Sequence, residues 1–226
     1  MRKNTSDFLY SQIINDFLNE NLKYGDKIVE LDLCNQYGTS RTPLREALAK
    51  LEKDGLVERQ VNNRLQIISI DENILDEIFD LRLSLESMVL KYALKYSKET
   101  SLFNDLQENL DLVDYYLKHE DVVTGRKVLS KFSEILYKQS RLKYTTKLIE
   151  NYNLLLYPLR TRSLMTLKRL YDAQEEHKHI YELLQDGSLA EVQKFNIYHL
   201  QTSMDSMRKQ LKISEGAYHK KSLSMG

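Results

Sequence analysis

The sequence predicts a mainly α-helical protein: an N-terminal winged helix-turn-helix followed by an all-α helical bundle. Only 7 glycines and 2 prolines occur among 226 residues, too few for the many turns of a β-sandwich, a β-barrel or a glycine-rich nucleotide fold. After residue 70, apolar residues recur at helical spacing almost without interruption. Hydrophobic residues make up 42% of the chain and charged residues 29%, which is typical of a globular protein with a buried core.

Short segments of changing type fill residues 1–70, which we expect to form a DNA-binding domain. Apolar spacing, a proline that suits a helix start and glycines that suit helix ends predict three helices, at about 8–18, 30–37 and 42–54. Two β-rich runs follow, at residues 56–61 and 65–70, and Asn62-Asn63-Arg64 between them is predicted to form a hairpin tip because Asn tolerates positive φ. This order of elements is that of a winged helix-turn-helix.

Residues 71–212 are predicted to form an all-helical domain for effector binding and dimerisation, and residues 213–226 a flexible tail. Asp121, Pro158 and Gly187 are expected to separate helices. The predicted helices cover about residues 71–97, 101–119, 121–139, 141–157, 164–185 and 188–212.

Charge and composition limit the classes of function. The chain has 33 basic and 33 acidic residues, so a nucleic-acid partner would have to meet a locally arranged positive field. No apolar run approaches the roughly 18 residues of a membrane span, so no membrane partner is expected. The absence of a secretory signal and the single Cys34 predict a cytoplasmic protein without a disulfide.

The predicted third helix begins with residues suited to reading DNA. A recognition helix enters the major groove by its N-terminal end, where Arg41 and Arg45 lie four residues apart on one side. Each arginine can donate two parallel hydrogen bonds to guanine. The hydroxyls of Ser40 and Thr42, with the free amides of the first turn, suit a phosphate oxygen.

The hairpin tip supplies the other candidate DNA contacts. The cations there, Arg59 and Arg64, would lie near the phosphate backbone or in the minor groove, and Asn62 and Asn63 at the tip are the other candidates. The alternative interpretation is that the arginines of both segments are ordinary solvated residues.

This segment closely resembles the DNA-binding domain of GntR-family transcription regulators. The resemblance rests on two strings, Gly38-Thr39-Ser40-Arg41-Thr42-Pro43-Leu44-Arg45-Glu46-Ala47-Leu48 and Leu51-Glu52-Lys53-Asp54-Gly55-Leu56-Val57-Glu58-Arg59. It implies that Arg41 and Arg45 read the operator and that the protein is a homodimer on a palindrome. The chain departs from the family at the wing, where Asn63-Arg64 stands in place of an Arg-Gly pair.

The helical half, opening with Phe79-Asp80-Leu81-Arg82-Leu83-Ser84-Leu85-Glu86, resembles the FadR-like branch with an FCD ligand-binding domain. The resemblance implies a small-metabolite effector, a carboxylate or other anion. Many FCD domains also hold Zn²⁺ or a similar ion with one Asp and three His, of which only His177 and His199 have matches here. Leu129 and Ser133 stand at the other two positions, and two imidazoles rarely hold a metal tightly. We therefore expect no metal cofactor, and His177 and His199 as ligands only if a site is retained.

Helical spacing places four polar residues on otherwise apolar stripes: Arg82, Ser133, His177 and His199. A bundle interior is a usual place for a small-ligand site, so these residues are the candidate effector contacts. Each also has a structural interpretation: a histidine can be a hydrogen-bonded core residue, Arg82 can pair with Glu86, and Ser133 can bond its own helix.

The sequence thus predicts a DNA-binding transcription regulator, not an enzyme, whose operator affinity responds to a metabolite in the helical domain. Two alternatives remain. One is a helical enzyme that uses His177 and His199 in a metal or acid–base site, although no acid or nucleophile stands at fixed spacing beside either. The other is a constitutive DNA binder without an effector.

Overall fold

The computed structural model describes residues 5–223 and the side chains of residues 5–213. By its internal contacts the chain divides into two compact units. Residues 5–71 together with 151–158 form the first, called here the winged unit, and residues 72–150 with 159–223 form the second, called the bundle. The last part of the predicted tail, residues 224–226, lies outside the described residues.

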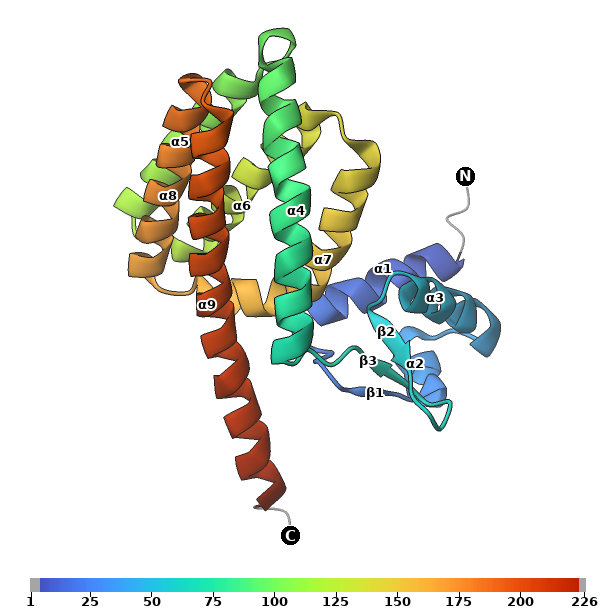
Figure 1. The fold of residues 1–226 in the computed structure, drawn as a ribbon. Helices are drawn as coiled ribbons and strands as arrows, with labels where there is room; N and C mark the ends of the chain where they lie inside the picture. The colour runs from blue at the N-terminus through green and yellow to red at the C-terminus, as the bar shows by residue number, and fades with distance from the viewer. Residues whose placement is uncertain (1–4, 224–226) are drawn as a thin grey trace. The chain divides into compact units, whose positions relative to one another are not determined.

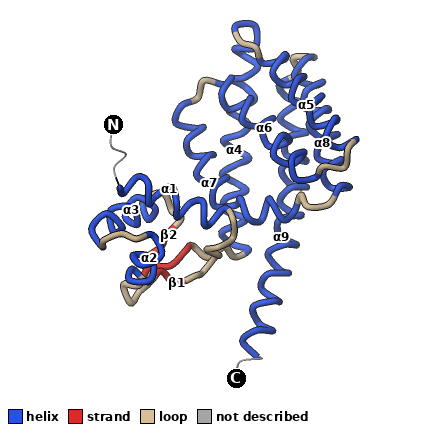
Figure 2. The backbone as a smooth tube through the Cα atoms, turned by 180° about the vertical axis from the view of Figure 1, so that it is seen from behind, coloured by secondary structure: helices blue, strands red, loops and turns tan. Residues whose placement is uncertain are grey.

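The winged unit combines helices with a small antiparallel sheet (Figures 1 and 2). Strand β3 is central in the order β1-β3-β2, with Lys27 opposite Gln66 and Val57 opposite Ile67. The predicted winged helix-turn-helix is therefore confirmed. Its elements are α1 (Thr5–Leu18), β1 (Lys27–Ile28), α2 (Glu30–Tyr37), α3 (Arg41–Lys53), β2 (Val57–Arg59) and β3 (Leu65–Ile67).

Apolar stripes on α1 and α3 build the core of this unit and fix the orientation of α3. Leu9, Ile13 and Phe17 of α1 are fully buried with Leu44 and Leu51 of α3. Two hydrogen bonds at the edge of this core help to fix how the helices are oriented against each other. The Tyr10 hydroxyl donates to Asp54 at 2.8 Å, and the Tyr37 hydroxyl donates to Asp16. Burial and the bond to Asp54 raise the pKa of Tyr10 to about 12.

Five longer helices and the two ends of a sixth, α7, form the bundle, whereas residues 151–158 of α7 belong to the winged unit (Figure 1). Helix α4 packs against α6 and α9, α5 packs against α6 and α8, and α8 packs against α9. These five helices therefore surround a common interior. The helices are α4 (Glu72–Tyr96), which a 3₁₀ turn (Ser97–Glu99) follows, α5 (Leu102–Lys118), α6 (Val122–Ser140), α7 (Lys143–Ser163), α8 (Leu167–Gln185) and α9 (Leu189–Leu223).

Two helix ends differ from the sequence expectation. Pro158 does not end a helix: it lies inside α7, which continues to Ser163. A proline inside a helix costs about 3 kcal/mol, but Ile149 and Leu159 of α7 are completely buried, and burial of such side chains favours the helix on both sides of the proline. Helix α9 continues to Leu223 instead of ending near residue 212, so helix covers most of the segment that the sequence predicts as a tail.

Candidate functional site

The N-terminus of α3 is exposed, and its backbone amides have no side-chain cap. Ser40 has extended backbone, with φ −87° and ψ 165°, and its hydroxyl makes no capping hydrogen bond. Ser40, Arg41 and Thr42 are exposed, while Leu44 on the opposite side of the helix is fully buried. The buried side anchors the helix, so the first turn presents amides and hydroxyls to solvent at the positive end of the helix dipole.

The two arginines of this turn differ in their partners. The Nε of Arg45 donates to both carboxylate oxygens of Glu30, each at 2.9 Å, and 63% of the Arg45 side chain stays exposed. Arg41 is exposed and forms no hydrogen bond or ion pair within the described part of the chain. Both arginines are thus exposed in the first turns of α3, and Arg45 but not Arg41 lines the groove described below.

The hairpin tip is also where the sequence places it. Asn63 has a φ of +61°, and the Asn62 side-chain oxygen accepts a hydrogen bond from the Arg64 amide at 3.0 Å. This local bond and the left-handed residue close the turn without a glycine. Arg59 pairs with Glu52 through Nε at 3.0 Å and Nη2 at 2.9 Å, and its Nη1 donates to the Asn63 carbonyl at 3.4 Å.

Residues of α3, the hairpin, β1 and the start of α2 line an open groove of about 680 Å³. Four cations line it, together with the carboxylates of Glu30 and Glu52. Sequence reasoning missed Lys27, Glu30 and Glu52, because none belongs to the recognition turn and they meet only through the sheet and the helix packing. The four cations are Lys27, Arg45, Arg59 and Arg64.

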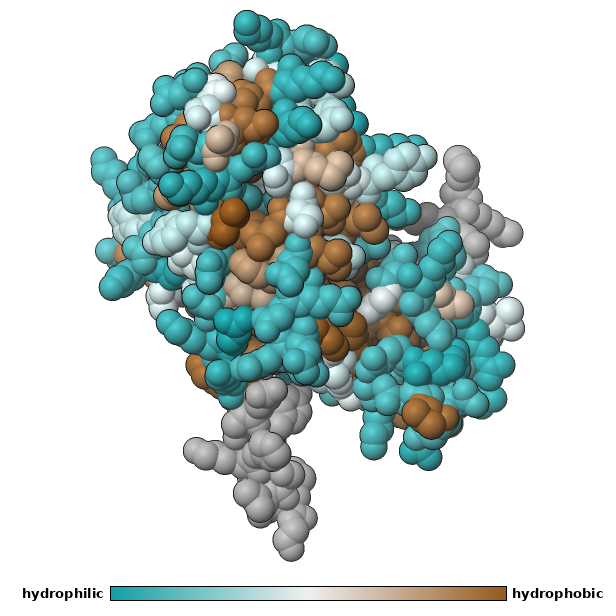
Figure 3. Space-filling view, in the orientation of Figure 1, coloured by the Kyte–Doolittle hydropathy of each residue, from teal (hydrophilic) through white to brown (hydrophobic). Residues whose placement is uncertain are grey.

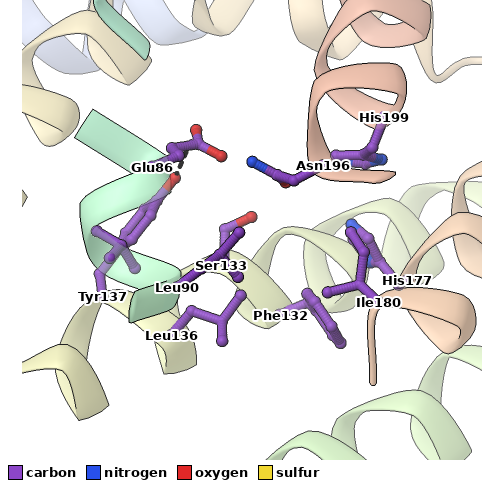
Figure 4. Close-up of a pocket in the computed structure, with 11 residues that line it drawn as sticks. Glu86, Leu90, Phe132, Ser133, Leu136, Tyr137, His177, Ile180, Asn196 and His199 are labelled. Carbon is purple, nitrogen blue, oxygen red and sulfur yellow. Dashed lines mark hydrogen bonds between the residues drawn. The ribbon is translucent and has the colours of Figure 1, made fainter. Parts of the chain in front are cut away.

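In the bundle, residues of α4, α6, α8 and α9 line a small cavity. Its void is about 10 Å³, room for about one water molecule. The structure brings Ser133, His177 and His199 together there, and Glu86 and Asn196 join them (Figure 4). The polar ends of Glu86, Ser133, His177 and Asn196 point toward the same space. Arg82 does not line the cavity.

Arg82 lies behind Glu86 and pairs with it, as the structural interpretation of this residue anticipates. The Oε1 atom of Glu86 accepts from Arg82 Nη2 at 2.7 Å and from Nε at 3.1 Å, and the Tyr137 hydroxyl donates to it at 3.3 Å. The other carboxylate oxygen of Glu86, Oε2, has no hydrogen-bond partner among the described residues. The guanidinium of Arg160 is affected by this pair: burial and the charge of Arg82 lower the pKa of Arg160.

His177 is a buried and uncharged histidine. Its ring stacks on Phe132 at 4.2 Å between centroids, and its Nδ1 is buried without a hydrogen-bond partner in the described chain. Burial, followed by the nearby His199, Arg160 and Arg169, lowers its pKa well below the ordinary value. A neutral imidazole nitrogen without a partner can bond a polar group that enters the cavity.

His199 is tied to a carboxylate that sequence reasoning missed. Its Nδ1 lies 2.6 Å from Glu176 Oε2, and Glu176 Oε1 accepts from Arg169 at 3.2 Å. Glu176 is only 7% exposed, because it adjoins the core stripe that holds His177. Its partner Arg169 precedes it by two helical turns, and this spacing was the available signal.

The donor set does not fit the metal site that the resemblance implies. Leu129 is apolar and buried, Ser133 offers a neutral hydroxyl, and one nitrogen of His199 already bonds Glu176. Among the described residues, no group of three or more His, Cys, Asp or Glu side chains is placed to hold an ion. Hydrogen-bonding groups, not metal ligands, are what this cavity offers.

Two family models match the chain. Residues 5–67 match the model described as "Bacterial regulatory proteins, gntR family", and residues 77–202 match the FCD domain. The two matches meet near the division between the winged unit and the bundle.

Similar proteins are described as regulators. The HTH-type transcriptional regulator YdhC of Bacillus subtilis (strain 168) is 28% identical over 76% of this chain and 77% of its own length. The Nta operon transcriptional regulator of Aminobacter aminovorans is 26% identical over 85% of this chain and 88% of its own.

Solved structures share the fold. A GntR regulator from a Rhodococcus species superposes with a TM-score of 0.70 at 16% identity, over 91% of this chain and 98% of that one. Escherichia coli McbR/YncC gives a TM-score of 0.68 at 19% identity, over 92% of this chain and 99% of that one. In the described part of the chain, no helix has the length and apolar character needed to cross a bilayer.

Proposed function

Because the chain belongs to the FCD branch of the GntR family of bacterial regulatory proteins, which are transcription regulators and not enzymes, we propose that it binds a palindromic operator in the cytoplasm as a homodimer. A small anionic metabolite in the bundle cavity then changes its affinity for that operator.

The observation that carries the DNA proposal is the exposed, uncapped N-terminus of α3 with two arginines on it. Arg41 and Arg45 contact base edges in the major groove, where a bidentate pair with guanine discriminates bases. Ser40 and Thr42, with the amides of the first turn, bind a phosphate. The wing residues Arg59, Asn62, Asn63 and Arg64 contact the backbone or the minor groove.

Dimerisation follows from the need to read both half-sites and from the bundle surface. A two-fold axis doubles each phosphate contact and repeats each base contact on the second half-site. Apolar side chains are exposed on the bundle face seen in Figure 3. Helix α4 contributes to the apolar surface, with Leu81 38% and Met88 44% exposed, and such surface is typical of an interface.

The experiment that tests operator reading is selection of bound duplexes from a random pool by the purified full chain. We expect a palindrome with guanines in each half-site, because Arg41 and Arg45 prefer guanine. Recovery of duplexes without a shared sequence would contradict base reading. A protein that elutes as a monomer together with this DNA would contradict the homodimer.

The effector proposal rests on the polar groups that meet around one void in the bundle (Figure 4). Burying an unpaired polar group is costly, and the His177 Nδ1 is such a group. The guanidinium groups of Arg82, Arg160 and Arg169 near the cavity outnumber the carboxylates of Glu86 and Glu176, which pair with Arg82 and Arg169. This excess of positive charge suits an anion. The void must widen to admit a metabolite, and this widening is the change that couples effector to DNA.

A thermal-shift screen of small carboxylates and other anions tests this part, since a ligand that binds the folded state raises the melting temperature. With the best compound, His177→Gln should weaken the effector response and leave the affinity for the selected duplex without effector unchanged. Loss of that basal affinity with an intact effector response would make His177 a core residue only. Glutamine keeps a neutral polar group in place, which limits the damage to folding.

A further inference from the structure

The groove of the winged unit contains two carboxylates that lie deeper than the arginines they hold. The Glu30 side chain is 30% exposed and that of its partner Arg45 is 63% exposed. Glu52 is 33% exposed and its partner Arg59 is 46% exposed. A groove that only attracts phosphates gains nothing from negative charge at its base, so these carboxylates need another explanation.

The two carboxylates hold their arginines in different ways. Glu52 binds Arg59 side-on through Nε and Nη2, and Nη1 reaches the Asn63 carbonyl at 3.4 Å. Three of the five N–H donors of Arg59 are thus used within the protein and tie α3 to the wing, and two remain for a DNA phosphate. Glu30 binds only the Nε of Arg45. Both terminal nitrogens of Arg45 are therefore left to donate elsewhere, and a parallel pair of donors is what guanine accepts.

We propose that Glu30 is a positioning residue that determines specificity: it holds Arg45 by Nε, directs its two terminal nitrogens at a base edge, and lowers the attraction of the groove for phosphates. This rests on the proposed function, in which Arg45 reads the operator. An unrestrained arginine is a long, flexible cation that binds any phosphate within reach. With Glu30 beneath it, Arg45 loses part of this general attraction and keeps its directed donors.

Glu30→Gln tests the proposal, with Glu46→Gln as the matched control. Both variants remove one negative charge and keep the side-chain volume. Glu46 is exposed on α3 and has no recorded bond to an arginine in the described chain. Affinities are measured for a random-sequence duplex and for the duplex selected with the native protein, at one salt concentration. Thermal unfolding of each variant checks that it is folded.

We expect Glu30→Gln to raise affinity for the random duplex about three- to fivefold, the usual scale of an exposed charge interaction. The ratio of selected to random affinity should fall at least about fivefold, because Arg45 loses its orientation. Glu46→Gln should change both affinities by less than about twofold and leave the ratio unchanged. In an Arg45→Ala background, Glu30→Gln should no longer alter the ratio.

Two results would overturn the proposal. One is a Glu30→Gln protein that matches Glu46→Gln on both duplexes. The other is a fall in the affinity ratio of the same size with Arg45 already removed, which would mean that Glu30 acts without it, for example by accepting a hydrogen bond from cytosine. Failure of the proposed function is distinct, since the native chain would then prefer no duplex over random sequence.

Discussion

The winged unit and the bundle both use arginine–glutamate pairs, in opposite surroundings. Arg45 and Glu30 meet at 2.9 Å on a surface where 63% of the arginine is exposed. Arg82 and Glu86 meet at 2.7 Å where the two side chains are only 8% and 9% exposed. The exposed pair can exchange partners with water or a ligand, whereas the buried pair cannot separate without leaving a charge in a low-dielectric interior.

This difference separates arginines that are exposed and available to a ligand from arginines that organise the interior. Exposed ion pairs contribute little to stability because water and salt screen them. The arginines of the winged unit are therefore available for binding at little cost to the fold. The buried arginines are available only indirectly, through the carboxylates they hold beside the cavity.

The largest effect on stability is expected at the buried pair of Arg82 and Glu86. Arg82→Ala should lower the free energy of unfolding by about 3–5 kcal/mol, because Glu86 would remain buried without its partner. Urea denaturation measures this loss. Replacing Arg45 by Ala in the same experiment should leave the free energy of unfolding within experimental error, and equal losses in the two variants would erase the distinction drawn here.

For DNA affinity, the exposed Arg45 is expected to matter more than the buried Arg82. Arg45→Ala should weaken binding to the selected duplex roughly ten- to hundredfold and relax the preference at one base of each half-site. Titration of the selected duplex and of duplexes changed at single bases measures both effects. Equal weakening on every duplex would instead show that Arg45 contacts only phosphate.

A pH series sharpens the description of the bundle. His177 has a lowered pKa in the folded chain, so the unfolded chain binds its proton first as the pH falls. Stability from this residue is present above the unfolded pKa of about 6.5 and is lost as the pH falls below it, on the order of 1 kcal/mol per pH unit. Urea denaturation of the native chain and of His177→Gln above and below that pKa should show a smaller fall in the variant. Parallel curves would contradict a buried neutral histidine.

The smallest effect is expected at the wing tip. Asn63 already has a φ of +61°, which glycine adopts without strain. Asn63→Gly should therefore change the free energy of unfolding by no more than about 0.5 kcal/mol, as measured by urea denaturation. Asn63→Val serves as the opposite control and should destabilise the chain, since a β-branched residue resists this conformation.

Local sequence signals predicted the parts of the molecule that local chemistry controls. The recognition turn from Ser40 to Arg45 and the tip at Asn63 depend on neighbouring residues, and both lie where expected. The inward stripes predicted one cavity lined by Arg82, Ser133, His177 and His199, and the last three line it whereas Arg82 does not. These patterns needed no knowledge of distant contacts.

Long-range packing decided the rest. Glu30 and Arg45 are fifteen residues apart on different helices, and Glu176 meets His199 across two helices. No periodicity marks such pairs. Pro158 lies within a helix because burial along α7 outweighs the local rule for proline. The seven-residue spacing of Arg169 and Glu176 was visible, but it indicates a pair only once both are known to be buried.

The size of the cavity has a kinetic consequence. A void of about 10 Å³ has room for about one water molecule, so a metabolite can enter fully only after the residues around it move. The association rate of any metabolite should then level off at high concentration, limited by how often the cavity opens. Dissociation would wait for the same event. A regulator built this way would average out brief fluctuations in metabolite level and respond to sustained ones.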